Sequence, residues 1–145
     1  MNLRNASLVG LTIAIIAIVT LVSRESLFAS GVVAISVQVL AAMLMVWARL
    51  EFGRRSFHAG ADPTEGGLVT SGPYRVLRHP IYAALLYFLW AGILSHLSPL
   101  NGILGVAATG GLIVRMVAEE RLVAERYPEY RTYAARTKRV IPFVV

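Results

Sequence analysis

Four long apolar segments leave this chain of 145 residues few folds to choose from. They are separated by short polar stretches and cover approximately residues 6–22, 27–48, 81–97 and 100–118. A helix needs about 20 apolar residues to cross the roughly 30 Å hydrocarbon core of a bilayer. The second segment is long enough, and the other three can be accommodated by flanking polar residues or local thinning of the bilayer.

The alternative interpretation, a soluble bundle of buried helices, conflicts with the composition. Hydrophobic residues make up 57% of the chain, and the mean hydropathy is +0.65. Four apolar helices in so small a chain leave too little polar surface for a soluble protein. The first segment resembles a signal peptide only in part, because its cleavage pattern is not convincing and more apolar segments follow. We therefore predict an all-α, polytopic membrane protein with about four transmembrane helices and a C-terminal helical segment at the cytoplasmic interface. By its length the chain is a single domain, residues 1–145.

The cations are distributed unevenly along the chain. All but one of the 14 Lys and Arg residues lie near the N-terminus, in the loop 49–78 or from Arg115 onward. With four spans these three regions share one side of the membrane, while the other side receives Arg24, which Glu25 offsets. Because cytoplasmic loops are enriched in Lys and Arg, both termini and the central loop are predicted to be cytoplasmic.

The net charge of +6 could suit nucleic acid, but the cations border apolar segments. This placement indicates membrane lipid headgroups or an anionic ligand, and no nucleic-acid partner. Cysteine is absent, which excludes a disulfide framework, a thiolate zinc site and a cysteine nucleophile. No metal site is predicted.

The run from Ser71 to Tyr82 has the densest mixture of turn formers, rings and cations in the chain. Gly72-Pro73 predicts a turn, and Pro80 fits the first position of the third helix, where its missing N–H costs nothing. His79 would then sit at the mouth of a helix N-terminus, a position that suits an anion. The same residue types also occur in simple juxtamembrane anchors.

A second polar stretch, residues 119–139, closes the chain. Glu119 and Glu120 follow the fourth apolar segment, and helical spacing pairs Arg115 with Glu119. Pro128 predicts a bend before a second, short helix. An amphipathic helix on the membrane surface is one interpretation. Two adjacent carboxylates beside an anionic leaflet are better explained if they face a cation, either an Arg of the protein or a charged ligand.

Both stretches together resemble a known family. The motifs are Gly72-Pro73-Tyr74-Arg75-x-x-Arg78-His79-Pro80-x-Tyr82, then Glu119-Glu120-x-Leu122-x-x-Glu125, Tyr130-x-x-Tyr133 and Arg139-x-Ile141-Pro142. In their order and spacing they resemble the isoprenylcysteine carboxyl methyltransferase family, which includes phospholipid methyltransferases and many small bacterial membrane enzymes. The similarity covers about half the chain, from Leu68 to Pro142, and the first two spans match only in being apolar.

The resemblance implies an enzyme that transfers a methyl group from S-adenosylmethionine to a lipophilic or lipidated acceptor. It places the cofactor site in residues 68–82 and 119–142. The implied cofactor-binding residues are Tyr74, Arg78, His79, Pro80, Tyr82, Glu119 and Glu120. Arg139 would border the substrate, and Arg139 and Glu120 are the candidate catalytic residues.

The acceptor stays open at this point. A carboxylate acceptor of the isoprenylcysteine kind, held by an Arg, needs no base, whereas the amine of a phospholipid would need Glu120 or His79 to remove its proton. Two other functions compete: a sterol-reductase-like membrane enzyme that uses NADPH, which would have Asn after the His, and a non-catalytic membrane protein.

Overall fold

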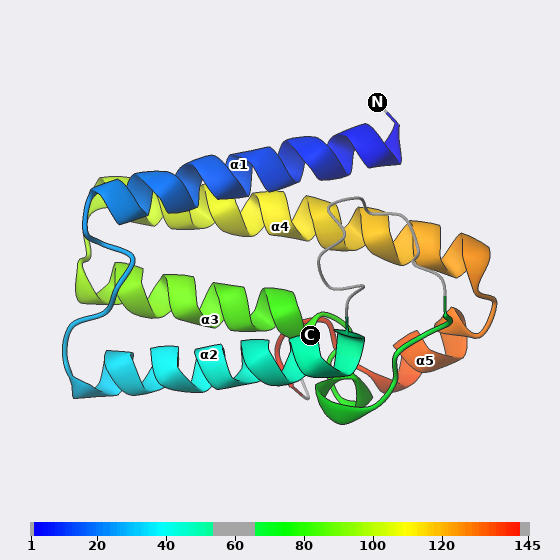
Figure 1. Ribbon diagram of the computed structural model, residues 1–145. Coiled ribbons are helices and arrows are strands. Elements are labelled where there is room, and N and C mark those ends of the chain that lie inside the picture. Colours follow the sequence, from blue (N-terminus) through cyan, green and yellow to red (C-terminus); the bar gives the residue numbers. More distant parts are fainter. Residues whose placement is uncertain (1, 54–65, 143–145) are drawn as a thin grey trace.

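The computed structural model describes residues 2–53 and 66–142, and over these ranges the chain folds into helices (Figure 1). The helices in chain order are α1 (Leu3–Ser23), α2 (Val32–Phe52), the short 3₁₀ helix η2 (Gly72–Arg75), α3 (Pro80–Ser95), α4 (Pro99–Arg126) and α5 (Tyr130–Arg136). The predicted all-α membrane fold is therefore confirmed.

The lengths of the helices refine the predicted spans. Among the described residues, α1, α2 and α4 are long and apolar enough to cross a membrane. Helix α3 has 16 residues, or about 24 Å at ~1.5 Å per residue, and it ends before the predicted residue 97. It falls short of the roughly 30 Å hydrocarbon core, so it spans only if the bilayer thins or polar flanks reach inward. Helix α4 continues past the predicted residue 118. Glu119 and Glu120 therefore lie on the same unbroken helix as the fourth predicted span.

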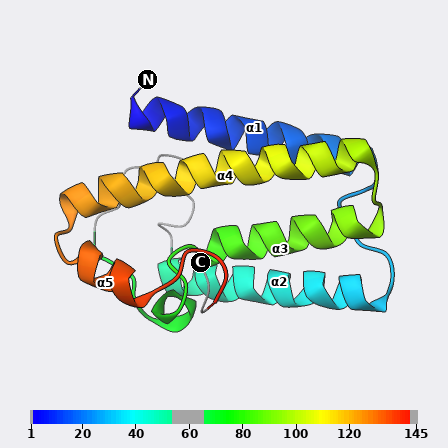
Figure 2. The same cartoon turned by 180° about the vertical axis from the view of Figure 1, so that it is seen from behind.

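The four long helices run alternately in opposite directions, with α1 beside α4 and α3 beside α2 (Figures 1 and 2). The start of α1, the segment 66–79 and α5 lie at one end of the molecule. The connections 24–31 and 96–98 lie at the other end. The cation pattern predicted this grouping of segments, and the cytoplasmic orientation of that end stays a prediction.

Helices α1 and α4 approach each other at two glycines. A Cβ on Gly10 would collide with the backbone oxygen of Gly111, and one on Gly111 would collide with that of Gly10. In a membrane, such small residues let two helix backbones pack closely. Next to this contact, α1, α3 and α4 share the apolar core, which consists of Ala14, Ala17, Leu21, Leu86, Leu89, Ile93, Ala108 and Leu112.

Helix α2 begins at Val32, five residues later than the prediction of a span from residue 27. The side chain of Gln38 explains the difference, because its amide binds the backbone of the preceding segment. It donates to Leu27 O at 2.8 Å and accepts from Ala29 N at 2.9 Å, and it also donates to Phe88 O of α3 at 2.9 Å. The segment before α2 thus has its polar groups bound without being helical, and Gly31 (φ +85°) turns the chain into the helix.

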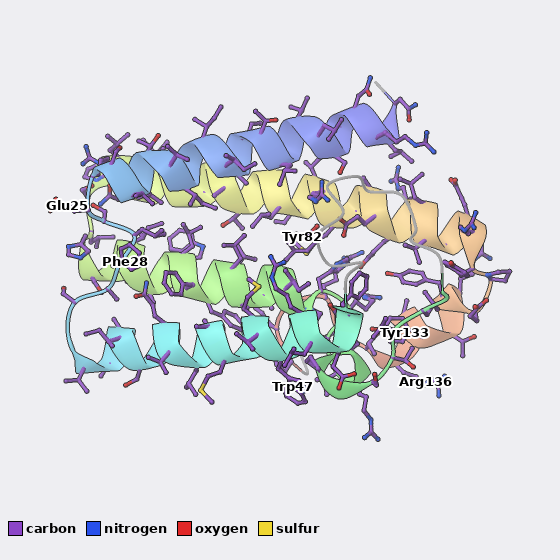
Figure 3. All side chains as sticks on the ribbon, viewed as in Figure 1. Glu25, Phe28, Trp47, Tyr82, Tyr133 and Arg136 are labelled. Carbon is purple, nitrogen blue, oxygen red and sulfur yellow. The ribbon has the colours of Figure 1, made fainter. Side chains whose placement is uncertain are left out.

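Figure 3 shows Glu25 and Phe28 at one end of the molecule and Tyr133 and Arg136 toward the other end, which holds the start of α1 and α5, with Tyr82 between them on α3. The second of these ends brings the two predicted site segments together.

Candidate functional site

The predicted turn at Gly72-Pro73 is present as η2, and it is fixed to the C-terminal end of α2. Ser71 Oγ donates to Glu51 Oε2 at 2.6 Å. Gly72 has a positive φ of 53°, and a Cβ there would collide with the Glu51 side chain, so glycine satisfies both constraints. Tyr74 is buried and stacks on Phe52 with ring centroids 5.5 Å apart.

The segment after η2 pairs with the C-terminal tail as two short parallel stretches. Arg78 N donates to Lys138 O at 2.6 Å, His79 N donates to Arg139 O at 3.0 Å, and Lys138 N donates to Val76 O at 2.9 Å. The partners are 60 or 62 positions apart in the chain, so only tertiary structure joins the two polar stretches.

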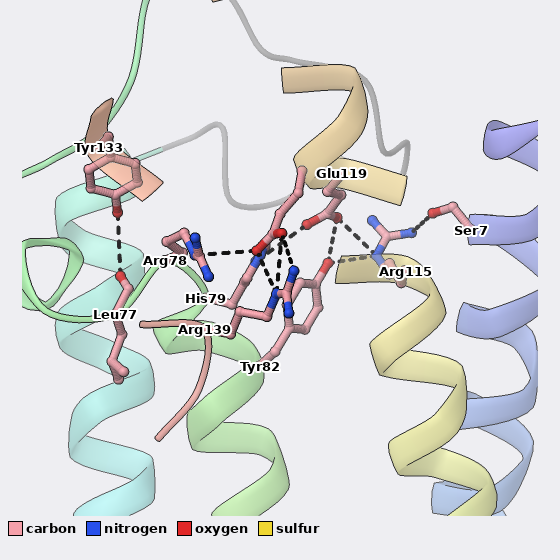
Figure 4. A network of polar contacts seen from close by, with 10 residues as sticks. Ser7, Leu77, Arg78, His79, Tyr82, Arg115, Glu119, Tyr133 and Arg139 are labelled. Atoms are coloured by element: carbon pink, nitrogen blue, oxygen red, sulfur yellow. Dashed lines mark hydrogen bonds and ion pairs between the residues drawn. The ribbon is translucent and has the colours of Figure 1, made fainter. Parts of the chain in front are cut away.

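Tyr133 of α5 also binds the backbone of this region, where the segment after η2 pairs with the C-terminal tail. Its hydroxyl donates to Tyr74 O at 2.8 Å and lies 3.4 Å from Leu77 O (Figure 4). Burial raises the pKa of Tyr133 to about 12, and the nearby Arg78 guanidinium limits that rise. The hydroxyl therefore remains a neutral donor at physiological pH.

His79 occupies the predicted place directly before the first residue of α3, Pro80. Its side chain is only 9% exposed. Nε2 lies 3.2 Å from Glu120 Oε1, and Nδ1 lies 3.8 Å from Glu119 Oε2, which is longer than a hydrogen bond. The ring thus faces both predicted glutamates (Figure 4).

Glu120 is surrounded by three cationic or potentially cationic side chains. Besides His79, Arg139 binds the carboxylate. Its Nε donates to Oε1 at 3.1 Å and to Oε2 at 3.2 Å, and its Nη2 donates to Oε2 at 3.0 Å. These contacts raise the pKa of Arg139 and keep its guanidinium charged. Arg78 Nε lies 3.3 Å from Glu120 Oε1, but it is buried and forms no hydrogen bond with the described residues. Arg78 Nη1 donates to Ala134 O at 3.0 Å.

Glu119 has different partners, which come from inside the helix bundle. Tyr82 Oη donates to Glu119 Oε1 at 2.6 Å, and Arg115 Nε lies 3.2 Å from the same oxygen. Arg115 Nε also donates to Tyr82 Oη at 2.6 Å, and its Nη1 donates to Ser7 Oγ of α1 at 3.3 Å.

The structure brings six of the predicted site residues into one network of hydrogen bonds and ion pairs: Arg78, His79, Tyr82, Glu119, Glu120 and Arg139 (Figure 4). Pro80 begins α3 as predicted. Tyr74 takes part through its ring, which packs on α2, and through its carbonyl oxygen.

The sequence did not indicate three contributions to the site: the hydrogen bonds of Ser7 to Arg115, of Glu51 to Ser71, and of the Tyr133 hydroxyl to the backbone. The predicted pairing of Arg115 with Glu119 is present, with Arg115 Nε 3.2 Å from Glu119 Oε1. Arg115 is 4% exposed and contacts Tyr82 as well, so its place in the network is central. Helical spacing was the one signal in the sequence, and nothing there indicates Ser7. Arg54, Arg55 and His58 of the central loop lie outside the described residues.

Much of the chain is similar to known proteins. The family model described as phospholipid methyltransferase matches residues 26–130, well over half the chain. The cobalt-zinc-cadmium resistance protein CzcN of Cupriavidus metallidurans is 36% identical over 76 residues, which are 52% of this chain and 35% of that protein. The nickel-cobalt-cadmium resistance protein NccN of Alcaligenes xylosoxydans xylosoxydans is 32% identical over 85 residues, which are 58% of this chain and 39% of that protein.

The chain thus spans less than two fifths of the length of these curated relatives. No solved structure matches it significantly. The family match contains α2, α3 and α4, and with them the Arg-His-Pro segment and the paired glutamates. With its motifs in the predicted order and in mutual contact, the chain belongs to the phospholipid methyltransferase family.

Proposed function

We propose that this protein transfers a methyl group from S-adenosylmethionine to a lipophilic acceptor at the membrane interface. The observation that carries the proposal is the contact between the two halves of the motif. His79, at the start of α3, lies 3.2 Å from Glu120 of α4, in a chain whose family is that of phospholipid methyltransferases. The network lies where α4 leaves its apolar part, the depth at which a lipid headgroup would meet a polar cofactor.

The groups present fit S-adenosylmethionine, which carries a sulfonium, an ammonium and a carboxylate. Glu119 and Glu120 can offset the two positive groups. Arg78 Nε, a buried donor without a hydrogen bond among the described residues, can serve the carboxylate. The positive end of the α3 dipole lies beside His79 and favours an anion there as well.

When bound, S-adenosylmethionine would supply an electrophilic methyl group, and the chain's residues would contribute binding, orientation and exclusion of water. Glu120 would exchange part of its contact with Arg78 and Arg139 for the cofactor's positive groups. Tyr82 and His79 would fix the two carboxylates in place.

For the acceptor, we propose carboxyl O-methylation of an isoprenylcysteine-like substrate. Arg139 is the most exposed member of the network, with 44% of its side chain accessible, and it can turn from Glu120 to an incoming carboxylate. A carboxylate is already a nucleophile, so no base is needed. Phospholipid N-methylation is the alternative, and there Glu120 or His79 would have to accept the proton of the amine.

The test is methyl transfer by the purified protein reconstituted in lipid. Radiolabelled S-adenosylmethionine is supplied with total lipid and protein extracts, and the labelled product is identified. A base-labile methyl ester indicates O-methylation, whereas a base-stable headgroup label indicates N-methylation. Binding of S-adenosylmethionine and of NADPH is compared on the same preparation, because preference for NADPH would favour a reductase.

Two variants complete the experiment. His79→Ala should abolish cofactor binding, while Arg121→Gln, which changes an exposed residue of α4, should retain it. A wild-type protein that neither binds S-adenosylmethionine nor labels any component would refute the proposal. A biological function retained by His79→Ala would instead indicate a non-catalytic protein.

A further inference from the structure

Arg115 is a buried cation within a membrane helix bundle. It lies on α4, one turn before Glu119, and only 4% of it is exposed. Burying a charge is unfavourable unless partners compensate it, and intramembrane charges commonly mark functional sites. Here the compensation is specific, because the Nε group reaches both Tyr82 Oη at 2.6 Å and Glu119 Oε1 at 3.2 Å.

The contacts of Arg115 determine which oxygen of Glu119 faces the site. Oε1 is engaged by Tyr82 and Arg115. Oε2 points to the other side, where His79 Nδ1 lies 3.8 Å away, beyond hydrogen-bonding distance. Oε2 is therefore the Glu119 oxygen positioned for a ligand, and it has that position because Arg115 and Tyr82 hold its neighbour.

Helix α1 contacts the Arg115 guanidinium through Ser7. Ser7 is fully buried, and its Oγ accepts a hydrogen bond from Arg115 Nη1 at 3.3 Å. About one turn away from this contact, Gly10, which follows Ser7 on α1, and Gly111, which precedes Arg115 on α4, bring the two backbones together. This close approach places the short serine side chain within reach of the guanidinium.

Helix α1 lies outside the part of the chain that the family model matches, residues 26–130. The motifs of the family therefore give no role to Ser7. Its contact with Arg115 nevertheless links α1 to the network.

We propose that Arg115 is a positioning residue that orients Glu119 and Tyr82 for the cofactor, and that Ser7 of α1 holds Arg115 in the required rotamer. This inference rests on the proposed function. Neither residue touches the cofactor in this scheme, so their effect should appear as a loss of cofactor affinity with little change in the chemical step.

The experiment measures the dissociation constant and KM for S-adenosylmethionine, kcat, and thermal unfolding for the full chain in lipid nanodiscs. Ser7→Ala removes one hydrogen bond to a charged group without adding volume, and should weaken cofactor affinity about 5- to 10-fold while kcat changes less than about 2-fold. Arg115→Lys keeps the charge but cannot contact all three partners, and should weaken affinity roughly 30-fold or more.

Two matched controls report nonspecific effects. Ser36→Ala removes an exposed serine of α2 whose hydroxyl donates to Val32 O of the same helix. Arg121→Lys makes the same exchange as Arg115→Lys at an exposed position of α4. Both should leave affinity, kcat and thermal unfolding unchanged. Should Arg115→Lys fail to fold, Ser7→Ala alone decides the question.

A purely structural role predicts a different result. In that case Ser7→Ala lowers the unfolding temperature but leaves the affinity of the folded protein unchanged, and this outcome overturns the inference while the proposed function stands. Wild-type protein that binds no S-adenosylmethionine overturns both.

Discussion

Replacing Glu120 with Gln is the most informative perturbation of the network. The carboxylate neutralises Arg78 and Arg139, which belong to two segments that pair side by side. Without it, two guanidinium groups face each other across that pairing, with His79 beside them. The junction between segments 76–79 and 138–139 should therefore open more often, while the apolar helices remain folded.

The burial of each partner sets the size of the effect. Removing one member of a fully buried ion pair costs about 3–5 kcal/mol. An exposed pair contributes only ~0–1 kcal/mol, and Arg139 is 44% exposed. The side chains of Arg78, His79 and Glu120 are 14%, 9% and 12% exposed, and Gln retains one acceptor oxygen. We therefore expect a local loss of about 2 kcal/mol, which is a roughly 30-fold increase in the opening equilibrium.

Hydrogen exchange followed by mass spectrometry measures this opening directly. Peptides that contain the amides of Arg78, His79 and Lys138 should exchange roughly 30-fold faster in the variant, in line with the expected loss, while peptides from α1 and α2 should not change. Glu125→Gln, which removes an exposed carboxylate from the same helix, is the control. Unchanged exchange at the junction, or an equal increase over the whole chain, would show that Glu120 does not hold the two segments together.

Two further substitutions test the packing around the site. Gly111→Ala should destabilise the protein in thermal unfolding by ~1–3 kcal/mol, because its Cβ would collide with Gly10 O; Gly110→Ala, where a Cβ meets nothing within 4 Å, should leave stability unchanged or raise it. Tyr133→Phe should cost about 1 kcal/mol near neutral pH by removing the hydrogen bond to Tyr74 O. Because the folded-state pKa of Tyr133 is raised to about 12, this stabilisation should be complete below the unfolded pKa of about 10 and disappear as the pH rises through 12. A Tyr133→Phe deficit that persists at the highest pH would contradict this assignment.

Local sequence signals predicted much of this architecture. Pro80 begins α3 as predicted, and the four apolar segments became the four long helices. The predicted start of the second span was wrong because a side chain binds the backbone of the segment before α2. Gln38 binds the backbone of residues 27–29, and no local signal in the sequence shows that a glutamine inside an apolar segment will do so.

The candidate site likewise has features that the sequence predicted and features that it did not. The sequence specified the residue types and their order: Arg78 and His79 before a helix, two adjacent glutamates after another, and Arg139 near the end. The positions of these residues relative to the helices could be predicted because helix starts and the lengths of apolar segments are local properties of the chain. Apart from Arg115 and Glu119, which helical spacing already pairs, the partners of these groups were decided by tertiary structure. The pairing of Glu120 with Arg139, and the support of Arg115 by Ser7, join residues that are 19 and 108 positions apart. Such contacts depend on how the helices cross, and the crossing of α1 and α4 is set by the close approach of two glycines.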